Sequence, residues 1–211
     1  MKILFLDTET TGLPEGKNIS LYHTQKWPYV IQLSYIIIDT DMNEVVHTYD
    51  SIIKLEENVN ITEKSITMHG ITKEQSHNEG VDISNALIEL NENLMEIDLI
   101  VGHNISFDKK IMIVENIRKK IFSLFPKKTY FCTMKNYTEF CNMPGVRKDG
   151  SNYIRYPKLV ELYEKLFDSV PENLHNSYKD VLVCARCYMK KEYDNDILET
   201  SKTFNMEWMK C

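Results

Sequence analysis

The chain opens with an unbroken apolar run, Ile3 to Leu6, that leads directly into two carboxylates, Asp7 and Glu9. Such a run predicts a strand that is covered on both faces in the middle of a sheet. Because side chains alternate along a strand, carboxylates at i and i+2 point the same way. Like charges in that position repel, and one pKa rises unless cations neutralise them. Mg²⁺ and Mn²⁺ prefer carboxylate oxygens, so this stretch predicts a metal site. A solvated strand end with two unrelated acids is the alternative.

Length and composition favour an ordinary globular protein. The chain has 211 residues, enough for a sizeable core, and its 43% hydrophobic content with only 7 Gly and 6 Pro is not typical of disorder. No apolar stretch approaches the roughly 20 residues of a membrane span. The apolar run before Asp7 is too short for a signal peptide. We therefore expect an intracellular, soluble protein that has no membrane partner, in either the cytoplasm or the nucleus.

The cysteines do not indicate a disulfide framework or a zinc site. They are five in number, which is odd, and we expect reduced thiols. Cys184 and Cys187 have metal-like spacing, but they lie in a helical pattern without a second close pair, which a four-ligand zinc site needs. The formal net charge of −6 does not exclude a polyanionic substrate. An enzyme that grips only a strand end makes few phosphate contacts, and bound metals reverse the local sign.

Hydrophobic periodicity predicts strands and helices in alternation after an initial group of three strands. Residues 142–156 are expected to form a loop because they contain Pro144, Gly145 and Gly150. The sum is an α/β fold with a mixed five-stranded sheet flanked by helices, in a domain that covers residues 1–192, followed by a tail at 193–211. The expected strands are 3–6, 30–39, 44–54, 99–101 and 129–133, and the expected helices are 61–68, 81–96, 107–122, 134–140, 159–166 and 178–191.

Two further acids follow predicted element ends. Asp108 comes after a buried strand, in the first turn of a helix that starts near Ser106, where open α/β sheets build their sites. Its alternative role is to complement the helix dipole. Asp180 lies near His175, and with Ser177 as the N-cap of a helix both side chains can approach one point. Because Ser-x-x-Asp is also a capping box, Asp180 has a purely structural alternative.

Taken together, these residues resemble the motifs of the DEDDh (DnaQ-like) exonucleases. The matching stretches are Asp7-Thr-Glu9-Thr-Thr-Gly12, Gly102-His-Asn104-x-x-Phe107-Asp108 and His175-x-x-x-x-Asp180, and His69-Gly70-Ile-Thr resembles a further segment of the family. The family includes the proofreading epsilon subunit of the bacterial replicative polymerase. The resemblance spans about residues 1–191. Residues 14–29 and the last 20 residues match nothing in it, and Asn176-Ser-Tyr stands where small residues are frequent.

The resemblance implies an RNase H-like fold and removal of nucleotides from a 3′ end with two divalent cations, Mg²⁺ or Mn²⁺. In this analogy Asp7 bridges both metals, Glu9 and Asp180 complete the first site, and Asp108 holds the second. His175 is the general base, and its ordinary pKa of about 6.5 suits neutral pH.

The same resemblance implies a set of substrate contacts at a free 3′ end, single-stranded for preference. The terminal 3′-OH meets the backbone around two threonines, and other residues flank the last base or line the pocket. The expected substrate-binding residues are Thr8, Thr10, Gly12, Leu13, His69, Gly70, Asn104 and Phe107.

Alternatives remain open at this point. DNA of a proofreading or repair pathway is the favoured substrate, while a 3′–5′ exoribonuclease or oligoribonuclease-like enzyme uses the same five residues. A catalytically silent nucleic-acid-binding adaptor is the alternative of another class, although none of the five residues is missing. A DNA polymerase or other protein partner, the pathway and the oligomeric state do not follow from the sequence.

Overall fold

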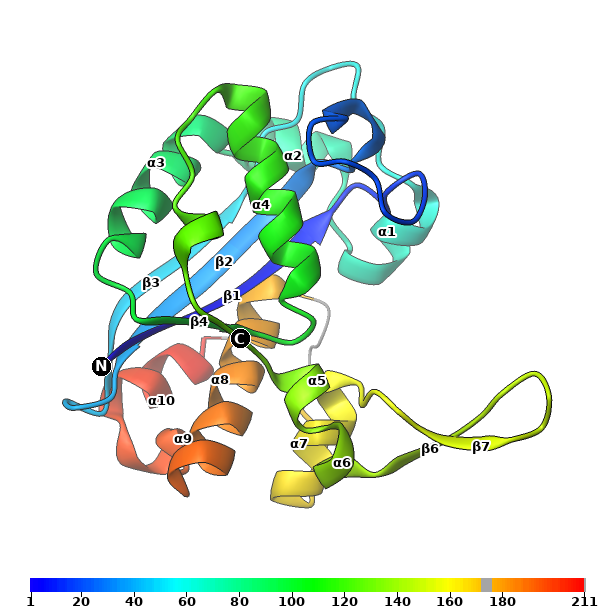
Figure 1. Cartoon of the computed structure of the whole chain (residues 1–211). Helices are drawn as coiled ribbons and strands as arrows, with labels where there is room; N and C mark the ends of the chain where they lie inside the picture. Colours follow the sequence, from blue (N-terminus) through cyan, green and yellow to red (C-terminus); the bar gives the residue numbers. More distant parts are fainter. Residues whose placement is uncertain (172–175, 211) are drawn as a thin grey trace.

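The computed structural model describes residues 1–171 and 176–210. Its centre is a five-stranded sheet in the order β3-β2-β1-β4-β5 (Figure 1). The central strand β1 (Lys2–Thr10) pairs antiparallel with β2 (Val30–Asp39) and parallel with β4 (Leu99–Gly102). The edges are β3 (Glu44–Ile52) and β5 (Tyr130–Cys132). The predicted α/β class and mixed five-stranded sheet are confirmed.

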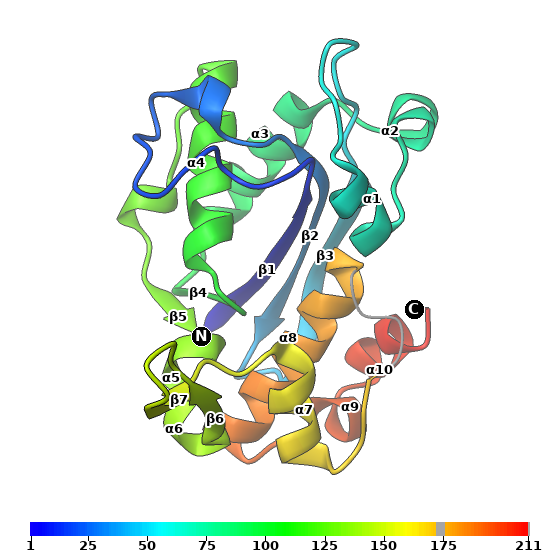
Figure 2. The same cartoon turned by 90° about the vertical axis from the view of Figure 1, so that its right-hand side faces the viewer.

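Helices cover both faces of this sheet (Figure 2). On one face lie α3 (Ile83–Leu94) and α4 (Ser106–Lys119), and on the other lies α8 (Ser177–Tyr193), followed by α9 (Ile197–Thr200) and α10 (Lys202–Trp208). The remaining elements are α1 (Glu63–His69), α2 (Lys73–Glu79), α5 (Thr133–Asn136), α6 (Thr138–Cys141), β6 (Met143–Val146), β7 (Asn152–Arg155), α7 (Leu159–Phe167) and two 3₁₀ turns at Thr24–Lys26 and Phe125–Lys127.

The alternation of side chains along β1 decides which helix each residue of the site faces. Leu4 and Leu6 pack in the core under α3 and α4, whereas Ile3 and Phe5 pack in the core under α8. All four side chains are at most 1% exposed. Every second residue of a strand lies on the same face, so Asp7 and Glu9 lie on the face of Ile3 and Phe5. Both carboxylates therefore face α8. Thr8 lies on the opposite face and faces α4.

The segment at 142–156 is not the loop that we expected. β6 and β7 pair antiparallel in a two-stranded hairpin that joins no other strand among the described residues. Gly150 stands in the left-handed region at φ +83°, and Asp149 accepts hydrogen bonds from the backbone and hydroxyl of Ser151, 3.0 and 2.7 Å. The Pro and Gly residues that suggested a loop therefore build a tight turn and a hairpin.

The C-terminal segment is folded against the sheet. Ile197 and Phe204 are fully buried in the same core as Ile3 and Phe5, and Glu44 at the start of β3 accepts hydrogen bonds from residues at the start of α10. Residues 196–208 thus contribute to the core beneath α8. Across 1–171 and 176–210 we find no helix that combines the length and the apolar character needed to span a bilayer.

Candidate metal centre and active site

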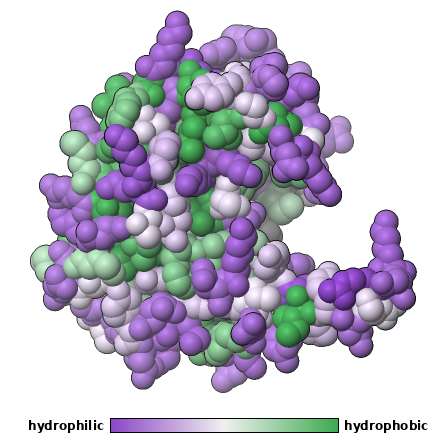
Figure 3. Space-filling view, in the orientation of Figure 1, coloured by the Kyte–Doolittle hydropathy of each residue, from purple (hydrophilic) through white to green (hydrophobic). Residues whose placement is uncertain are grey.

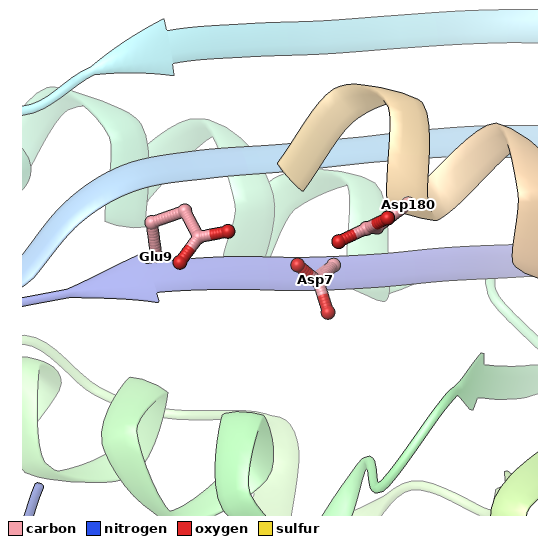
Figure 4. Close-up of side chains that lie close together, drawn as sticks. All are labelled: Asp7, Glu9 and Asp180. Carbon is pink, nitrogen blue, oxygen red and sulfur yellow. The ribbon is translucent and has the colours of Figure 1, made fainter. Parts of the chain in front are cut away.

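Three of the predicted carboxylates converge at one point. Asp7, Glu9 and Asp180 each offer an oxygen, and these oxygens all lie within 4.8 Å of one another. Figure 4 shows Asp7 and Glu9 rising from β1 toward Asp180, which comes down from the first turns of α8. Residues 173 positions apart in the chain are thus brought together by the packing of α8 on the central strand.

The start of α8 is held over β1 by buried polar contacts. Ser177 donates its backbone N–H to the Gln32 side chain at 3.3 Å, and its hydroxyl bonds to that of Ser34. Gln32 and Ser34 of β2 both donate to Asp50 on β3, at 2.9 and 2.7 Å. Because Ser34 lies beside Asp7 in the sheet, this network fixes α8 directly above the carboxylates.

Our assignment of Ser177 as the N-cap of α8 is wrong. The N-cap is Asn176, whose side-chain oxygen accepts from the backbone of Tyr178 and Lys179 at 3.1 and 3.3 Å. Ser177 occupies the first helical position instead, and its hydroxyl is used against β2. Asp180 then lies one residue beyond the capping-box position, so it does not form the capping box that the sequence suggested.

Asp108 approaches the same region from α4. It is 4% exposed, and one of its oxygens accepts from the backbone N–H and the hydroxyl of Thr8, at 3.1 and 2.8 Å. The parallel pairing of β1 with β4 covers only Ile3–Phe5, so the N–H of Thr8 has no strand partner on that side. The Asp108 carboxylate accepts the hydrogen bond that a strand carbonyl would otherwise accept from Thr8. The close approach is possible because Gly102 ends β4: a Cβ at that position would lie 2.9 Å from the carbonyl oxygen of Leu6.

Three of these carboxylates have raised pKa values, which indicates a site that favours bound cations. Burial, followed by the charges of Asp108, Asp180 and Glu9, raises the pKa of Asp7 well above its ordinary value. Burial and the neighbouring aspartates raise the pKa of Glu9 to about 8. Burial raises the pKa of Asp108 to about 7, against the opposing effect of the Thr8 hydrogen bonds. None of these causes is a positively charged side chain. Hard oxygen ligands in a partly buried cluster of carboxylates that raise one another's pKa fit divalent metal ions.

A pocket of about 470 Å³ opens beside the carboxylates. Glu9 belongs to its wall, so the pocket and the acidic cluster are continuous. Leu13 and Met68 stand at its rim with 74% and 46% of their surface exposed. The lining residues are Thr8, Glu9, Thr10, Gly12, Leu13, Thr62, Lys64, Ser65, Met68, His69 and Phe107.

The structure brings together most, but not all, of the predicted substrate residues. Gly70 ends α1 in the left-handed region at φ +75° and does not line the pocket. Asn104 lines a neighbouring hollow together with Phe107. Apart from the predicted His69, the contribution of α1 was missed, because nothing in the sequence of 62–68 points toward a site. The additional lining residues are the N-cap Thr62 and, from α1 itself, Lys64, Ser65 and Met68. His175, the predicted general base, lies outside the described residues.

Comparison with known proteins assigns the family. The family model RNase T, described as an exonuclease, matches residues 4–188. The chain belongs to this exonuclease family. The predicted DEDDh relationship is thereby confirmed, and with it the enzyme class: an exonuclease, which is a hydrolase of phosphodiester bonds. No curated protein matches the sequence.

Solved structures share the fold of this exonuclease at low identity. E. coli exonuclease I in complex with a dA16 oligonucleotide aligns over 99% of this chain and 42% of its own, with 16% identity and a TM-score of 0.61. The nuclease domain of 3′hExo, described as a DEDDh family member bound to rAMP, aligns over 93% and 94%, with 18% identity and a TM-score of 0.66. A full-length 3′-exonuclease aligns over 92% and 83%, with 18% identity and a TM-score of 0.67. The chain thus spans about two fifths of exonuclease I, and the RNase H-like fold is confirmed.

Proposed function

We propose that this exonuclease removes nucleotides one at a time from the 3′ end of DNA, using two divalent cations, Mg²⁺ or Mn²⁺. The observation that carries the proposal is the convergence of Asp7, Glu9 and Asp180 within 4.8 Å beside an open pocket. Asp108 from α4 adds a fourth carboxylate on the other side of β1. A catalytically silent adaptor has no need of such a cluster, since its burial and mutual repulsion are costly without cations.

Two cations can share these four carboxylates if Asp7, which lies between the others, contributes to both. Asp7, Glu9 and Asp180 would hold one cation, and Asp7 with Asp108 would hold the second. When bound, such a metal pair supplies an activated water and stabilises charge on the attacking and leaving oxygens of the phosphodiester. We assign His175 as the general base by its place in the family motif, because an imidazole near neutral pKa can accept a proton from the attacking water.

The pocket beside Glu9 suits the last nucleotide of a strand. Leu13 and Met68 offer exposed apolar surface against which a base can stack, and Lys64 supplies a cation at the rim. Thr8, Thr10, Gly12, His69 and Phe107 also line this pocket, which supports their proposed contacts with the 3′ nucleotide. The backbone N–H and hydroxyl of Thr8 both donate to Asp108, so Thr8 can contact a 3′-OH only as an acceptor, through its carbonyl or hydroxyl oxygen.

The test is a cleavage assay with end-labelled single strands of DNA and RNA of one sequence. We expect mononucleotides released from a free 3′ end, full inhibition by EDTA and recovery with Mg²⁺ or Mn²⁺. A 3′-phosphorylated or circular strand should resist. A preference for RNA would move the chain to the exoribonuclease alternative, and fragments cut from a circular strand would contradict the proposal. Mismatched and matched duplexes in the same assay report on a proofreading role.

A further inference from the structure

The hairpin of β6 and β7 projects from the body of the protein beside the proposed active site. We refer to residues 143–156 as the arm. Figure 1 shows the arm leaving the body near α5 and α7, with α1 above it, and Figure 3 shows the surface hollowed between the arm and the part of the molecule above. In Figure 2 the N-terminal end of α8 lies between the arm and α1. The arm therefore flanks the opening into which a strand must enter.

The arm contributes little to the fold. Val146, Tyr153, Ile154 and Tyr156 leave 68%, 40%, 49% and 55% of their surfaces exposed, and all of residues 146–154 are exposed. An isolated two-stranded hairpin is marginally stable in water, and exposed apolar side chains on such an element indicate a binding surface. Burial of these apolar side chains by a ligand would therefore stabilise the arm.

The base of the arm is fixed to the segment that leads to Asp108. Burial lowers the pKa of His103 to about 4, so its imidazole is neutral at pH 7. Its Nε2 lies 3.1 Å from the carbonyl oxygen of Pro157 and donates to it, while Nδ1 lies 3.0 Å from the Thr133 hydroxyl. His103 follows β4 directly, five residues before Asp108. The orientation of the arm is therefore linked to the element that carries a catalytic carboxylate.

The charge of the arm opposes that of the whole chain. The chain carries a net charge of −6, but the arm, residues 143–156, holds three cations and a single acid. The acid, Asp149, is used to close the turn through Ser151. Arg155 is paired with Glu161 at 2.6 Å, whereas Arg147 and Lys148 at the tip have no carboxylate partner within the described residues. A local positive tip on an acidic protein fits a polyanion.

Arg147 and Tyr153 form a prearranged pair on one face of the arm. The Tyr153 ring lies across Gly145, where an added Cβ would be 2.7 Å from the ring, and the Arg147 guanidinium stands 4.8 Å above the ring centre. Opposite residues of the hairpin share a face, so Tyr153 and Gly145 are on one side, with Ile154 and Pro144 on the other. A partly exposed aromatic ring with a guanidinium over it is a combination that binds single strands, because bases stack on aromatic and guanidinium planes and phosphates meet the cation.

We propose that the arm binds the single strand that is being shortened, several nucleotides before its 3′ end. This inference rests on the proposed exonuclease function. The arm would give long strands a second binding contact, in addition to the pocket for the 3′ nucleotide. From Met143 to the tip at Asp149 the arm reaches about 20 Å at roughly 3.3 Å per residue. At about 3.4 Å per nucleotide, that length matches roughly six phosphates of a stacked strand. The arm should therefore act on long strands and not on the shortest ones.

The experiment compares two arm variants with a matched control. Arg147→Ala/Lys148→Ala removes the charge of the tip, and Tyr153→Ala removes the aromatic ring. Lys190→Ala/Lys202→Ala removes the same charge from the end of α8 and the start of α10, away from the arm. Circular dichroism of each variant checks the fold. Binding of labelled dT4 and dT20, with rU4 and rU20 in parallel, is followed by fluorescence anisotropy in EDTA, so that no strand is cleaved.

We expect the double arm variant to bind the 20-mer about tenfold more weakly and the 4-mer unchanged. The slope of log K against log salt should fall in magnitude by about 1.4, because each phosphate contact on a single strand contributes about 0.7. Tyr153→Ala should weaken binding of the 20-mer by roughly fivefold or more, since base stacking on one ring is worth about 1–3 kcal/mol, with little change in slope. The control should behave like the wild type.

A small chromogenic substrate separates failure of this inference from failure of the proposed function. The p-nitrophenyl ester of thymidine 5′-monophosphate occupies only the catalytic centre, so with Mn²⁺ the wild type and both arm variants should hydrolyse it equally. Loss of hydrolysis of both this ester and oligonucleotides by the wild type would refute the function itself. Normal hydrolysis with equal 20-mer affinity and salt slope in wild type and arm variants would overturn the inference. An equal loss for 4-mer and 20-mer would overturn it as well.

Discussion

Thr8 donates two hydrogen bonds to a single oxygen of Asp108, one from its backbone and one from its hydroxyl, at 3.1 and 2.8 Å. A side chain on β1 thus fixes the orientation of a carboxylate on α4. Groups that orient metal ligands in this way are commonly worth about 10- to 100-fold in metal affinity.

Replacement of Thr8 by Val should therefore weaken the site without removing a ligand. Thr8→Val keeps the β-branched shape and the backbone bond but loses the hydroxyl. We expect Mn²⁺ affinity and kcat to fall roughly tenfold, at the lower end of the range for such orienting groups. Thr8→Ser, which retains the hydroxyl, should restore both. Calorimetric titration with Mn²⁺ and steady-state cleavage measure the two effects. Wild-type behaviour in Thr8→Val would show that Asp108 does not depend on this hydroxyl.

The raised carboxyl pKa values predict a pH-dependent stability of the metal-free protein. The pKa of Glu9 is raised to about 8 and that of Asp108 to about 7, above the values of the unfolded chain. The folded state therefore binds more protons, and stability that is present below pH 4 is lost as the pH rises through 7 to 8.

We expect the Tm measured in EDTA to decline from pH 5 to pH 8 and to be raised by Mn²⁺ most strongly at the upper end, because metal binding requires deprotonated ligands. Asp108→Asn should flatten the decline in EDTA. A Tm that rises over this interval in EDTA would contradict the assigned direction of the shifts. Differential scanning calorimetry in matched buffers is the measurement.

The C-terminal helices should be required for stability. Phe204 is fully buried beneath α8, and truncation of such a side chain to Ala typically costs about 3–5 kcal/mol. Phe204→Ala should lower the free energy of unfolding by that amount in urea titrations. Met209→Ala, at a position that is 76% exposed in the same segment, is the matched control and should change little. Equal stability of the two variants would mean that residues 197–208 do not support the core.

We expect His175 to accept a proton from the attacking water and not to bind the metal ions. His175→Ala removes no proposed ligand, so Mn²⁺ should bind as in the wild type while kcat falls by about 10²- to 10⁴-fold, the usual effect of removing a general base. The wild-type rate should rise through a pKa near 6.5, and the variant should lack that step while recovering part of its rate at high pH. An unchanged pH profile, or loss of Mn²⁺ binding, would assign His175 another role.

Local sequence pattern was sufficient for the sheet and for the acids on β1. The apolar run Ile3–Leu6 predicted a buried strand, and period two then placed Asp7 and Glu9 on one face. Local pattern could not predict that Asp7 and Asp180 lie close together, because their proximity depends on how α8 packs across β1. That prediction came from the resemblance to the motifs of the DEDDh family.

Other features depend on contacts that no local pattern encodes. Asn176 and Ser177 are both good capping residues, and the buried contact of Ser177 with Ser34 decides between them. Gly145 and Gly150 read as loop residues, although one accommodates the Tyr153 ring and the other a turn at positive φ. The contacts of Thr8 with Asp108 depend on β4 diverging from β1, which only the folded sheet shows.

The central claim is that Asp7, Glu9, Asp108 and Asp180 form one metal centre that carries the cleavage. Calorimetric titration with Mn²⁺, run beside a 3′-end cleavage assay, tests it most directly in wild type, Asp7→Asn and the control Asp41→Asn, whose side chain is 85% exposed and remote from the cluster. We predict two Mn²⁺ ions and full turnover for the wild type and the control, and loss of both in Asp7→Asn. A wild type that binds no Mn²⁺, or an Asp7→Asn variant that binds two ions and turns over normally, would contradict it.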